Sequence, residues 1–234
     1  MMKVVILCGG FGTRLGKETK IIPKPMVKID KYPILVHILK HYHKHGFNDF
    51  ILALGYKGEK IQKYFKNNKF NFKVKPIHTG KKTLTGGRLL KLKTLLSNEK
   101  NFMLTYGDGL TNQNIKKLVK FHLKHKKIAT MTVVRPPVRF GEVALKNNKV
   151  VRFKEKPQIK SSWINGGFFV FTKKIFKYLK KYNEMLERKP LEKLSSQKEL
   201  MAFKHDDFWQ CMDTQRDKEL LVKLIKNKEA PWLK

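Results

Sequence analysis

A glycine-rich segment directly behind the first apolar run has the residue types best suited to phosphate chemistry. Residues 9–14 read GGFGTR, and Lys24 follows ten residues later between two prolines. Glycine leaves backbone N–H groups open to phosphate oxygens, because it has no Cβ and readily adopts positive φ. The guanidinium of Arg14 can bind a phosphate with two hydrogen bonds, and Lys24 adds a point charge. The segment predicts a phosphate-binding loop; an ordinary turn with incidental charges is the alternative.

Two common nucleotide-binding patterns do not fit this loop. The dinucleotide fingerprint G-x-G-x-x-G fails at its third glycine, where the chain has Leu15, and no acidic residue follows a second strand at the expected place. The P-loop pattern G-x-x-x-x-G-K-[ST] is absent. We therefore interpret the segment as a phosphate-binding loop of another kind.

Asp108 is the acidic residue best placed to meet such a loop. It stands between Gly107 and Gly109 after a predicted strand, at the edge where open α/β sheets bind ligands. The glycines leave room for a metal and a nucleotide. A second aspartate, Asp213, precedes Thr214 near the last predicted helix. A turn is the alternative for Asp108, and capping of the following helix is the alternative for Asp213.

Alternating strands and helices must position these residues. Apolar, β-branched runs typical of buried parallel strands alternate with segments of helical periodicity through the first half of the chain. The expected strands span residues 3–8, 49–54, 72–77, 101–106 and 128–134, and the expected helices span 33–45, 59–66, 84–96 and 112–125. This order predicts an α/β fold with right-handed crossovers and a largely parallel sheet.

The pattern changes after residue 137. Short strands are expected at 142–145, 150–154, 168–172 and 201–204, and helices at 173–181, 191–196 and 214–227. This second half mixes strands with helices and is expected to extend the same sheet. We predict one domain over residues 1–234, with a nucleotide-binding half at 1–135 and a second half at 136–234.

The chain is strongly basic, with 52 Lys and Arg residues against 18 Asp and Glu and a net charge of +34. Such an excess is typical of proteins that bind nucleic acid or anionic membranes. Only seven of the 52 are arginines, on which readers of base edges usually depend, and the lysines are scattered from end to end. We expect a lysine-rich surface that attracts small anionic substrates, with no specific nucleic-acid partner.

Cysteine content and the lengths of the apolar runs indicate the cellular compartment in which we expect the protein. Cys8 and Cys211 form no disulfide framework, and residues 1–7 are too short an apolar stretch for a signal peptide. No apolar run approaches the roughly 20 residues of a transmembrane helix. These features predict a soluble cytoplasmic protein without membrane insertion.

Three histidines recur at helical spacing, at His37, His41 and His45. This spacing could bind zinc, but no glutamate or cysteine lies among them. A polar helix face is the preferred interpretation.

Motifs along nearly the whole chain resemble the sugar-1-phosphate nucleotidylyltransferases, the enzymes that make nucleotide sugars. They are GGFGTRL (9–15), PKPM (23–26), TLTGGR (83–88), TYGDG (105–109), RFGEVAL (139–145), RFKEKP (152–157), WINGGFFV (163–170) and FWQCMDTQRD (208–217). TGGR and WINGGFFV are most similar to the branch that uses CTP and glucose 1-phosphate. The resemblance implies a Rossmann-like nucleotide-diphospho-sugar transferase fold with a mixed, mainly parallel central sheet.

The resemblance also implies a reaction. An oxygen of the sugar 1-phosphate attacks the α-phosphorus of CTP in line, and pyrophosphate leaves, with positioning and charge stabilisation as the main catalytic effects. Arg14, Lys24 and Asp108 are the implied catalytic residues. Asp108 and Asp213 are the implied ligands of Mg²⁺, which favours carboxylates together with phosphate oxygens.

The implied binding residues divide between the two halves of the chain. Those for the nucleotide are Leu7, Gly9, Gly10, Phe11, Gly12, Thr13, Arg14, Lys24, Thr83, Gly86, Arg88 and Gly107. Those for the sugar phosphate are Gly141, Glu155, Lys156, Asn165 and Gly166, which makes 136–234 the sugar-binding half.

The choice of base follows from donors and acceptors. Cytosine offers N3 and O2 as acceptors, whereas uracil and thymine carry a hydrogen on N3. The guanidinium of Arg88 only donates, so an Arg88 facing this edge favours CTP over UTP or dTTP.

Two departures from the branch leave alternatives open. The region between residues 65 and 79 is shorter than expected for the branch. Because this region contributes to subunit packing in the branch, we expect a homo-oligomer but not the same packing of its subunits. Residue 144 is alanine where the branch suggests an acidic residue. Another sugar phosphate or another base therefore remains an alternative, as does a silent binding subunit, although Arg14, Lys24, Asp108 and Asp213 are all present.

Overall fold

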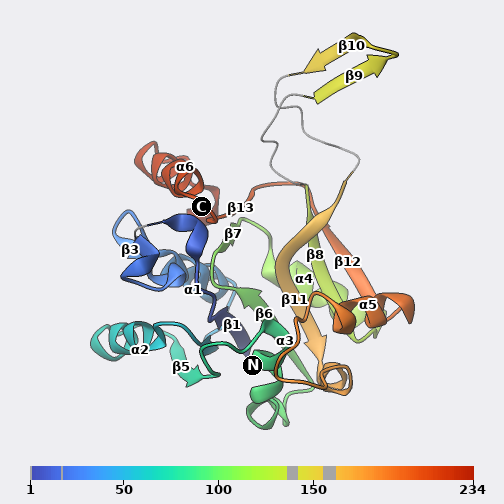
Figure 1. Ribbon diagram of the computed structural model, residues 1–234. Coiled ribbons are helices and arrows are strands. Elements are labelled where there is room, and N and C mark those ends of the chain that lie inside the picture. Colours follow the sequence, from blue (N-terminus) through green and yellow to red (C-terminus); the bar gives the residue numbers. More distant parts are fainter. Residues whose placement is uncertain (1, 17, 136–141, 155–161) are drawn as a thin grey trace.

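Seven strands form a mixed central sheet in the computed structural model of the chain, which describes residues 2–16, 18–135, 142–154 and 162–234 (Figure 1). The spatial order is β12-β8-β11-β6-β1-β4-β5. Strand β11 runs antiparallel to both neighbours, and the other pairs are parallel. The predicted α/β fold with a mainly parallel sheet is confirmed. The strands are β1 (Val4–Cys8), β4 (Asp49–Leu54), β5 (Lys73–His78), β6 (Asn101–Tyr106), β8 (Ala129–Val134), β11 (Ile164–Thr172) and β12 (Leu200–His205).

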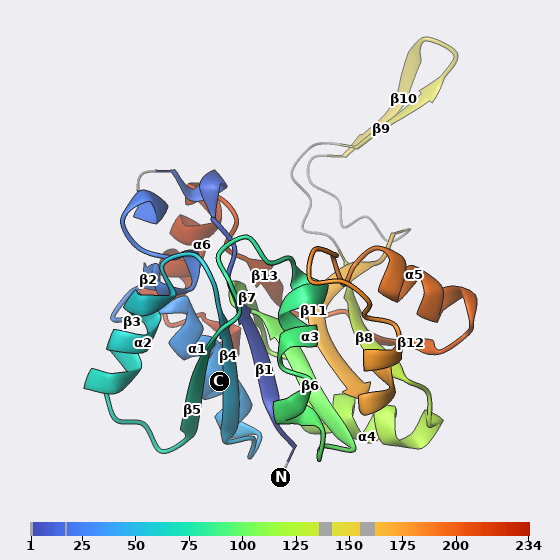
Figure 2. The same ribbon diagram turned by 60° about the horizontal axis from the view of Figure 1, so that its bottom comes forward.

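Helices cover both faces of this sheet (Figure 2). They are α1 (Ile34–Lys44), α2 (Gly58–Asn67), α3 (Thr85–Lys91), α4 (Ile115–His125), α5 (Lys189–Ser196) and α6 (Gln215–Lys226). Val4 and Ile6 point into a core shared with α1, α2, α4 and α6. Val5 and Leu7 point into the opposite core, shared with α3 and α5. Burial on both faces explains why β1 is an unbroken apolar run rather than an alternating one.

The expected elements agree closely with the observed ones except at two helices and at β11, which begins at Ile164 rather than at the expected residue 168. The helix expected at 84–96 ends at Lys91 and continues after a turn as a 3₁₀ turn at Thr94–Leu96. The helix expected at 173–181 is a 3₁₀ helix at Lys173–Lys177. Ile175, Phe176 and Leu179 are already buried by this short turn, so the apolar spacing that suggested a longer helix is satisfied without one.

Four short strands were missed by the sequence analysis: β2 (Lys28–Ile29), β3 (Tyr32–Pro33), β7 (Gly109–Thr111) and β13 (Trp209–Cys211). Runs of two or three residues carry no readable periodicity. The β7–β13 pair matters most, because it joins the segment after β6 to the segment before α6.

A hairpin of β9 (Glu142–Lys146) and β10 (Lys149–Lys154) stands apart from the sheet (Figure 1). Val143 pairs with Phe153 and Leu145 with Val150, and all four side chains are 47–64 % exposed. The two strands fall where the sequence pattern predicted them. Their apolar side chains contribute little to the core.

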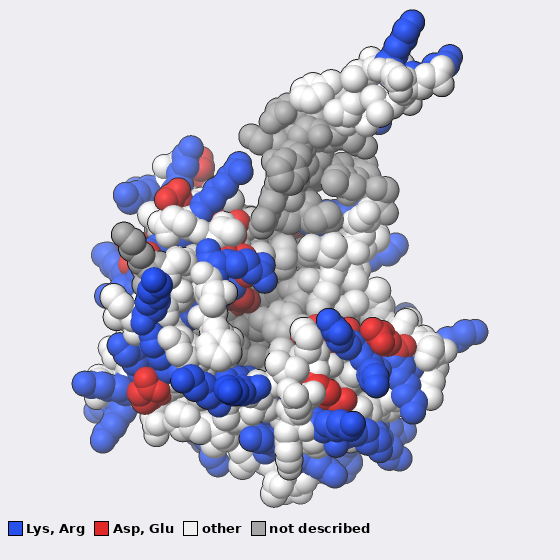
Figure 3. All heavy atoms as spheres, in the orientation of Figure 1, with Lys and Arg blue, Asp and Glu red and all other residues white. Residues whose placement is uncertain are grey.

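Charge is spread over the surface. Figure 3 shows Lys and Arg side chains on the left, the bottom and the lower right of the visible face, with few Asp and Glu side chains among them. Within the described residues, no helix is long and apolar enough to cross a membrane. This distribution fits the expected lysine-rich surface.

Buried histidines should make the fold sensitive to acid. Burial, reinforced by His45, lowers the pKa of His41 to about 4, and burial with His125 lowers the pKa of His122 to about 4. The unfolded chain binds these protons near pH 6.5, so the free energy of unfolding should fall as the pH drops from about 6.5 toward 4, by up to about 1.4 kcal/mol per pH unit for each histidine.

Urea unfolding at several pH values measures this slope. The His41→Gln variant can still donate a hydrogen bond toward Gln113, whose carbonyl contacts His41 Nε2, but it cannot titrate. It should therefore show a shallower loss of stability between pH 6.5 and 4 than the wild type. Equal slopes in the two proteins would contradict the assignment.

Candidate active site

The carboxyl ends of β1 and β6 place the glycine loop beside Asp108. The strands are parallel neighbours with Leu7 opposite Tyr106, and Gly107 N donates a hydrogen bond to Leu7 O at 3.1 Å. Residues that follow Leu7 and Tyr106 therefore leave the sheet at the same edge. This is the edge at which open α/β sheets bind ligands.

A cavity of about 200 Å³ opens at this edge. Of the ten residues that line it, seven were predicted as site residues and three were not. The lining residues are Leu7, Gly9, Gly10, Lys24, Pro25, Thr85, Arg88, Tyr106, Gly107 and Asp108. The structure thus gathers the glycine loop, the PKP segment, the TGGR segment and the GDG segment around one hollow.

Lys24 joins the two predicted metal ligands. Its Nζ lies 2.5 Å from Asp108 Oδ2 and 2.5 Å from Asp213 Oδ1, so these two oxygens lie no farther apart than twice that distance. Arg14 adds a contact of 3.0 Å from its guanidinium to Asp213 Oδ2. The four charged residues selected from the sequence therefore form a single cluster.

The short β7–β13 pair brings Asp213 to this cluster. Gly109 pairs with Cys211, and Met212 N donates a hydrogen bond to Asp108 O at 2.9 Å. Asp217 accepts hydrogen bonds from the backbone N–H groups of Asp213 and Thr214. Asp213 is therefore fixed from both sides, and the helix cap that the sequence suggested for it is made by Thr214 with Asp217.

The ammonium of Lys24 stays charged in this environment. Burial alone would lower the pKa of Lys24, but the charges and hydrogen bonds of Asp108 and Asp213 raise it above its ordinary value. The side chain of Lys24 is 13 % exposed, whereas that of Arg14 is 75 % exposed. Lys24 therefore forms the floor of the cluster, and Arg14 lies at its rim, open to an incoming anion.

The backbone around this loop needs glycine for two different reasons. Gly12 has a φ of 66°, and a Cβ there would lie 2.9 Å from Lys24 Cβ. A Cβ on Gly9 would lie 2.0 Å from the central guanidinium carbon of Arg88. Gly10 has no atom within 4 Å of such a position, so its Cα borders open space.

Arg88 is 4 % exposed and its guanidinium is held by backbone oxygens. One terminal nitrogen donates to the carbonyls of Leu54 and Gly80 and to the hydroxyl of Thr79, at 2.7–3.0 Å. The other donates to Gly9 O at 2.9 Å and to Lys81 O at 3.4 Å. These hydrogen bonds of Arg88 link the glycine loop to the end of β4 and to the segment after β5. Whether it also faces a base stays a prediction.

Two residues expected on the sugar side, Asn165 and Gly166, do not line this cavity, but Asn165 contacts Tyr106, which does. Asn165 Nδ2 donates to the hydroxyl of Tyr106 at 3.3 Å, and Asn165 Oδ1 accepts from Gly167 N at 2.8 Å. The carbonyl of Gly166 accepts from the indole of Trp209 at 2.7 Å. The predicted residues Gly141, Glu155 and Lys156 lie outside the described residues.

The histidines considered for zinc are structural. His37 and His41 are buried, and their Nε2 atoms contact the carbonyls of Ile29 and Gln113. The expectation of a polar helix face was wrong for these two, because α1 buries that face against the core. Within the described residues, no group of three or more His, Cys, Asp or Glu side chains is arranged to hold a metal ion.

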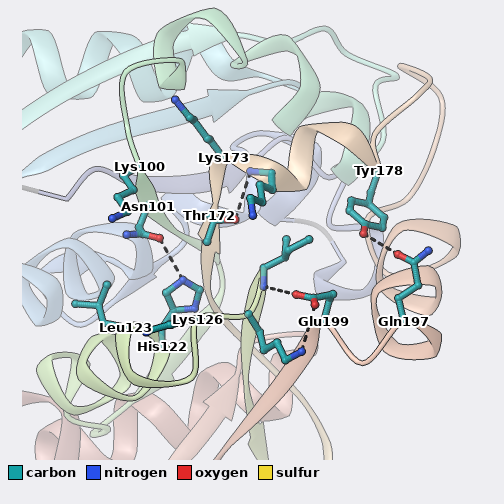
Figure 4. A pocket seen from close by; sticks show the side chains of 13 residues that line it. Lys100, Asn101, His122, Leu123, Lys126, Thr172, Lys173, Tyr178, Gln197 and Glu199 are labelled. Atoms are coloured by element: carbon teal, nitrogen blue, oxygen red, sulfur yellow. Dashed lines mark hydrogen bonds and ion pairs between the residues drawn. The ribbon is translucent and has the colours of Figure 1, made fainter.

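A larger cavity of about 870 Å³ lies at the opposite, amino ends of β6 and β8 (Figure 4). Five lysines and one carboxylate, Glu199, line it. Glu199 accepts from Ile128 N at 3.1 Å and contacts Lys127 Nζ at 3.3 Å. This cavity has no pair of carboxylates comparable to Asp108 and Asp213, so its size alone does not make it the reaction centre.

The class of protein that this sheet and charged cluster define is confirmed by comparison. The family model described as nucleotidyl transferase matches residues 3–215. The chain belongs to this family. Enzymes of this kind generally use a divalent metal, and the two carboxylates that share Lys24 are the kind of ligand that fits one.

Individual relatives cover almost the whole chain. It is 42 % identical to the glucose-1-phosphate cytidylyltransferase of Salmonella typhimurium, over 99 % of this chain and 98 % of that protein. It is 32 % identical to the D-glycero-alpha-D-manno-heptose 1-phosphate guanylyltransferase of Aneurinibacillus thermoaerophilus, over 89 % and 91 %. The crystal structure of HddC from Yersinia pseudotuberculosis in complex with GMP-PN has a TM-score of 0.76 and 26 % identity, over 96 % and 100 % of the two chains.

Replacing Lys24 by methionine should destabilise the metal-free protein and increase its response to a divalent cation. Methionine keeps an apolar stem but removes the ammonium that Asp108 and Asp213 share. We expect a loss of about 1–3 kcal/mol, because two neighbouring carboxylates then repel in a partly buried place. Mg²⁺ should raise the melting temperature of this variant more than that of the wild type.

Thermal unfolding after treatment with a chelator, with and without added Mg²⁺, measures both effects. Lys127→Met is the matched control, because it removes an ammonium from a more exposed pair with Glu199. It should change neither quantity much. Equal Mg²⁺ shifts in Lys24→Met and wild type would contradict this account of the cluster.

Replacing Gly9 by alanine should be costly only while Arg88 is present. The added methyl group overlaps the guanidinium, and we expect a loss of about 1–3 kcal/mol in the free energy of unfolding. An Arg88→Ala background removes the three atoms nearest to the added methyl group, so Gly9→Ala should cost less there. Denaturant unfolding of the four proteins gives the coupling free energy, and additive effects would contradict the packing argument.

Proposed function

We propose that the chain transfers a cytidylyl group from CTP to α-D-glucose 1-phosphate and releases CDP-glucose and pyrophosphate. The cluster of Lys24, Asp108 and Asp213 at the glycine loop carries this proposal. It supplies two carboxylates and an ammonium at a phosphate-binding edge of the sheet. The 42 % identity to a glucose-1-phosphate cytidylyltransferase over nearly the whole chain supports the choice of both substrates.

The reaction is a displacement at the α-phosphorus of CTP. A phosphate oxygen of glucose 1-phosphate forms the new P–O bond, the bond to the bridging oxygen of the β-phosphate breaks, and pyrophosphate leaves with that oxygen. No proton needs to be removed from an ionised phosphate. The chain therefore has to align the reactants and balance the growing negative charge on the leaving group.

The charged cluster has the groups for this task. Arg14, exposed at the rim, and Lys24, on the floor, bind the triphosphate and stabilise the charge of the leaving pyrophosphate. Asp108 and Asp213 hold Mg²⁺, which when bound neutralises charge on the phosphate oxygens. Lys24 has to give up part of its contact with the aspartates when it binds phosphate. Residues 9–13 contribute backbone N–H groups, and Gly10, bordered by open space, lies where a phosphate can approach most closely.

The nucleotide-binding half is 1–135 and the sugar-binding half is 136–234. Asn165 and Gly166 are assigned to the sugar side, and Gly141, Glu155 and Lys156, which lie outside the described residues, are assigned to it from the sequence motifs. Glu155 binds sugar hydroxyl groups, and Lys156 binds the sugar phosphate. Ala144 cannot supply the acidic contact expected of the branch, so the sugar is held with one polar contact fewer.

Selection of cytosine rests on Arg88, Thr83 and Gly86. An Arg88 N–H directed at cytosine meets the acceptors N3 and O2, whereas uracil and thymine present a hydrogen at N3. Both terminal nitrogens of Arg88 contact backbone carbonyls in the ligand-free protein. Recognition by Arg88 therefore requires the guanidinium to share one of these hydrogen bonds with the base.

The proposal also covers the oligomeric state of the protein and its cellular compartment. The alignment with the Salmonella relative runs over 253 positions, so at least 19 of them are gaps in this chain of 234 residues. The chain is therefore shorter than this relative, and the place of the shortening at 65–79 stays a prediction. A homo-oligomer remains a prediction, which light scattering tests. A reaction that consumes a nucleoside triphosphate is expected in the cytoplasm, where such triphosphates are made.

Pyrophosphate release from CTP, UTP, dTTP and GTP with glucose 1-phosphate and Mg²⁺ tests the proposed function. CTP should give the highest kcat/KM. Asp108→Asn should lower kcat by at least about 100-fold with CTP, because it removes a charge that acts on the reacting phosphates. Asp30, an exposed residue between β2 and β3, offers the matched control Asp30→Asn, which should keep wild-type activity.

Other outcomes of this assay are informative. A preference for UTP, dTTP or GTP would overturn the cytosine assignment and keep the chemistry. Silence with every triphosphate and glucose 1-phosphate would overturn the sugar assignment, and a panel of other sugar 1-phosphates would then identify the acceptor. Silence with that panel as well would leave a binding protein.

A further inference from the structure

A segment of the second half, residues 182–187, lies against the start of α3 (Figure 2). The carbonyl of Glu184 accepts hydrogen bonds from Gly86 N at 3.1 Å and Gly87 N at 3.3 Å, and Leu186 N donates to Thr85 Oγ1 at 2.9 Å. A Cβ on Gly87 would lie 1.9 Å from the carbonyl oxygen of Tyr182. The TGG sequence is therefore needed for close packing against this segment.

Glu187 ends this segment and reaches the cavity wall with its carboxylate. Oε1 accepts a hydrogen bond from the hydroxyl of Tyr106 at 2.5 Å, and Oε2 accepts one from Thr85 Oγ1 at 2.6 Å. Tyr106 and Thr85 both line the cavity that holds Lys24 and Asp108. One carboxylate thus fixes two side chains from different elements of the nucleotide-binding half.

Tyr106 extends this contact to the sugar side. Its hydroxyl donates to Glu187 and accepts from Asn165 Nδ2 at 3.3 Å. Its ring packs on Gly167, where a Cβ would lie 2.5 Å from the ring. Tyr106 also stands two residues before Asp108. The chain Thr85–Glu187–Tyr106–Asn165 therefore connects both substrate sides with the strand end that carries Asp108.

The two hydroxyl groups of Tyr106 and Thr85 meet the two oxygens of the Glu187 carboxylate separately, one each. Within the described residues, Glu187 makes no ion pair with a lysine or arginine that would draw the carboxylate elsewhere. Hydrogen bonds from hydroxyl groups to a carboxylate are in general shorter and stronger than those between neutral groups.

We propose that Glu187 is a positioning residue of the transfer reaction. It sets the distance between the wall of the nucleotide pocket at Thr85 and the sugar side at Asn165, by holding Thr85 and Tyr106 together. It touches no reacting atom itself. This inference rests on the proposed function, because it assigns Glu187 to the alignment of that reaction's two substrates.

The Glu187→Gln variant tests the proposal. Glutamine has nearly the same size but one acceptor oxygen, so either Tyr106 or Thr85 loses its acceptor. We expect kcat/KM to fall about 10–100-fold, as small misplacements of bound reactants do, with KM raised for CTP and for the sugar phosphate alike. The matched control is Glu192→Gln, an exposed position on α5, which should behave as wild type.

A double-mutant cycle with Tyr106→Phe separates positioning from other roles. Phenylalanine removes the hydroxyl that Glu187 holds, so Glu187→Gln should lose most of its effect on kcat/KM in this background. Additive effects, or a rise of KM for the sugar phosphate alone, would overturn the proposal in favour of direct sugar binding. A lowered melting temperature with unchanged KM values would overturn it in favour of a purely structural contact.

Failure of this proposal and failure of the proposed function are distinguishable. If the wild type is active and Glu187→Gln is equally active, only the role of Glu187 is overturned. If the wild type releases no pyrophosphate with any substrate pair, the proposed function is overturned, and with it the role of Glu187 in transfer. Calorimetric titration of CTP into wild type and Glu187→Gln reads out the nucleotide side without turnover, and equal dissociation constants would count against the proposal.

Discussion

The shared ammonium of Lys24 is the interaction on which the site depends. Asp108 and Asp213 come from distant parts of the sequence, and two ionised carboxylates at this spacing repel each other unless a positive charge stands between them. Lys24 supplies that charge from a 3₁₀ turn at Lys24–Met26, between two prolines that restrict its backbone. The fold can therefore hold a pair of acidic groups before any substrate arrives.

This constraint explains which parts of the fold are rigid. Asp108 follows the central strand β6, and Asp213 is attached to it by the β7–β13 pair and the hydrogen bond from Met212 N to Asp108 O. Each carboxylate is thus fixed through its backbone, whereas the ammonium sits at the end of a flexible stem. A lysine can exchange part of its contact for phosphate oxygens without moving the sheet, which a shorter or planar cation in its place could not do as easily.

The sequence predicted correctly those elements whose residue pattern has a single physical cause. The runs that form β1, β4 and β6 are apolar throughout because helices cover both faces, and their bounds were predicted nearly residue by residue. Lys24, Asp108 and Asp213 were selected from motifs, and the structure brings them together. The β7–β13 pair was not predictable, because three residues on each side carry no pattern. Glu187 was missed because nothing in its local sequence marks a carboxylate that contacts residues 81 and 102 positions away.

The sequence analysis selected glycines that the structure needs, but the reason it gave for them was incomplete. Absence of a side chain in the loop was attributed to close approach of a phosphate, and Gly86 in TGGR was assigned to the nucleotide. At Gly9 the space is filled by the guanidinium of Arg88, and at Gly87 by the backbone of Tyr182. The first N–H groups of α3, which elsewhere can bind a phosphate, are bonded to Glu184 O at Gly86 and Gly87. The proposed phosphate site is therefore the loop after β1, and α3 forms a wall of the cavity whose place is set by the second half of the chain.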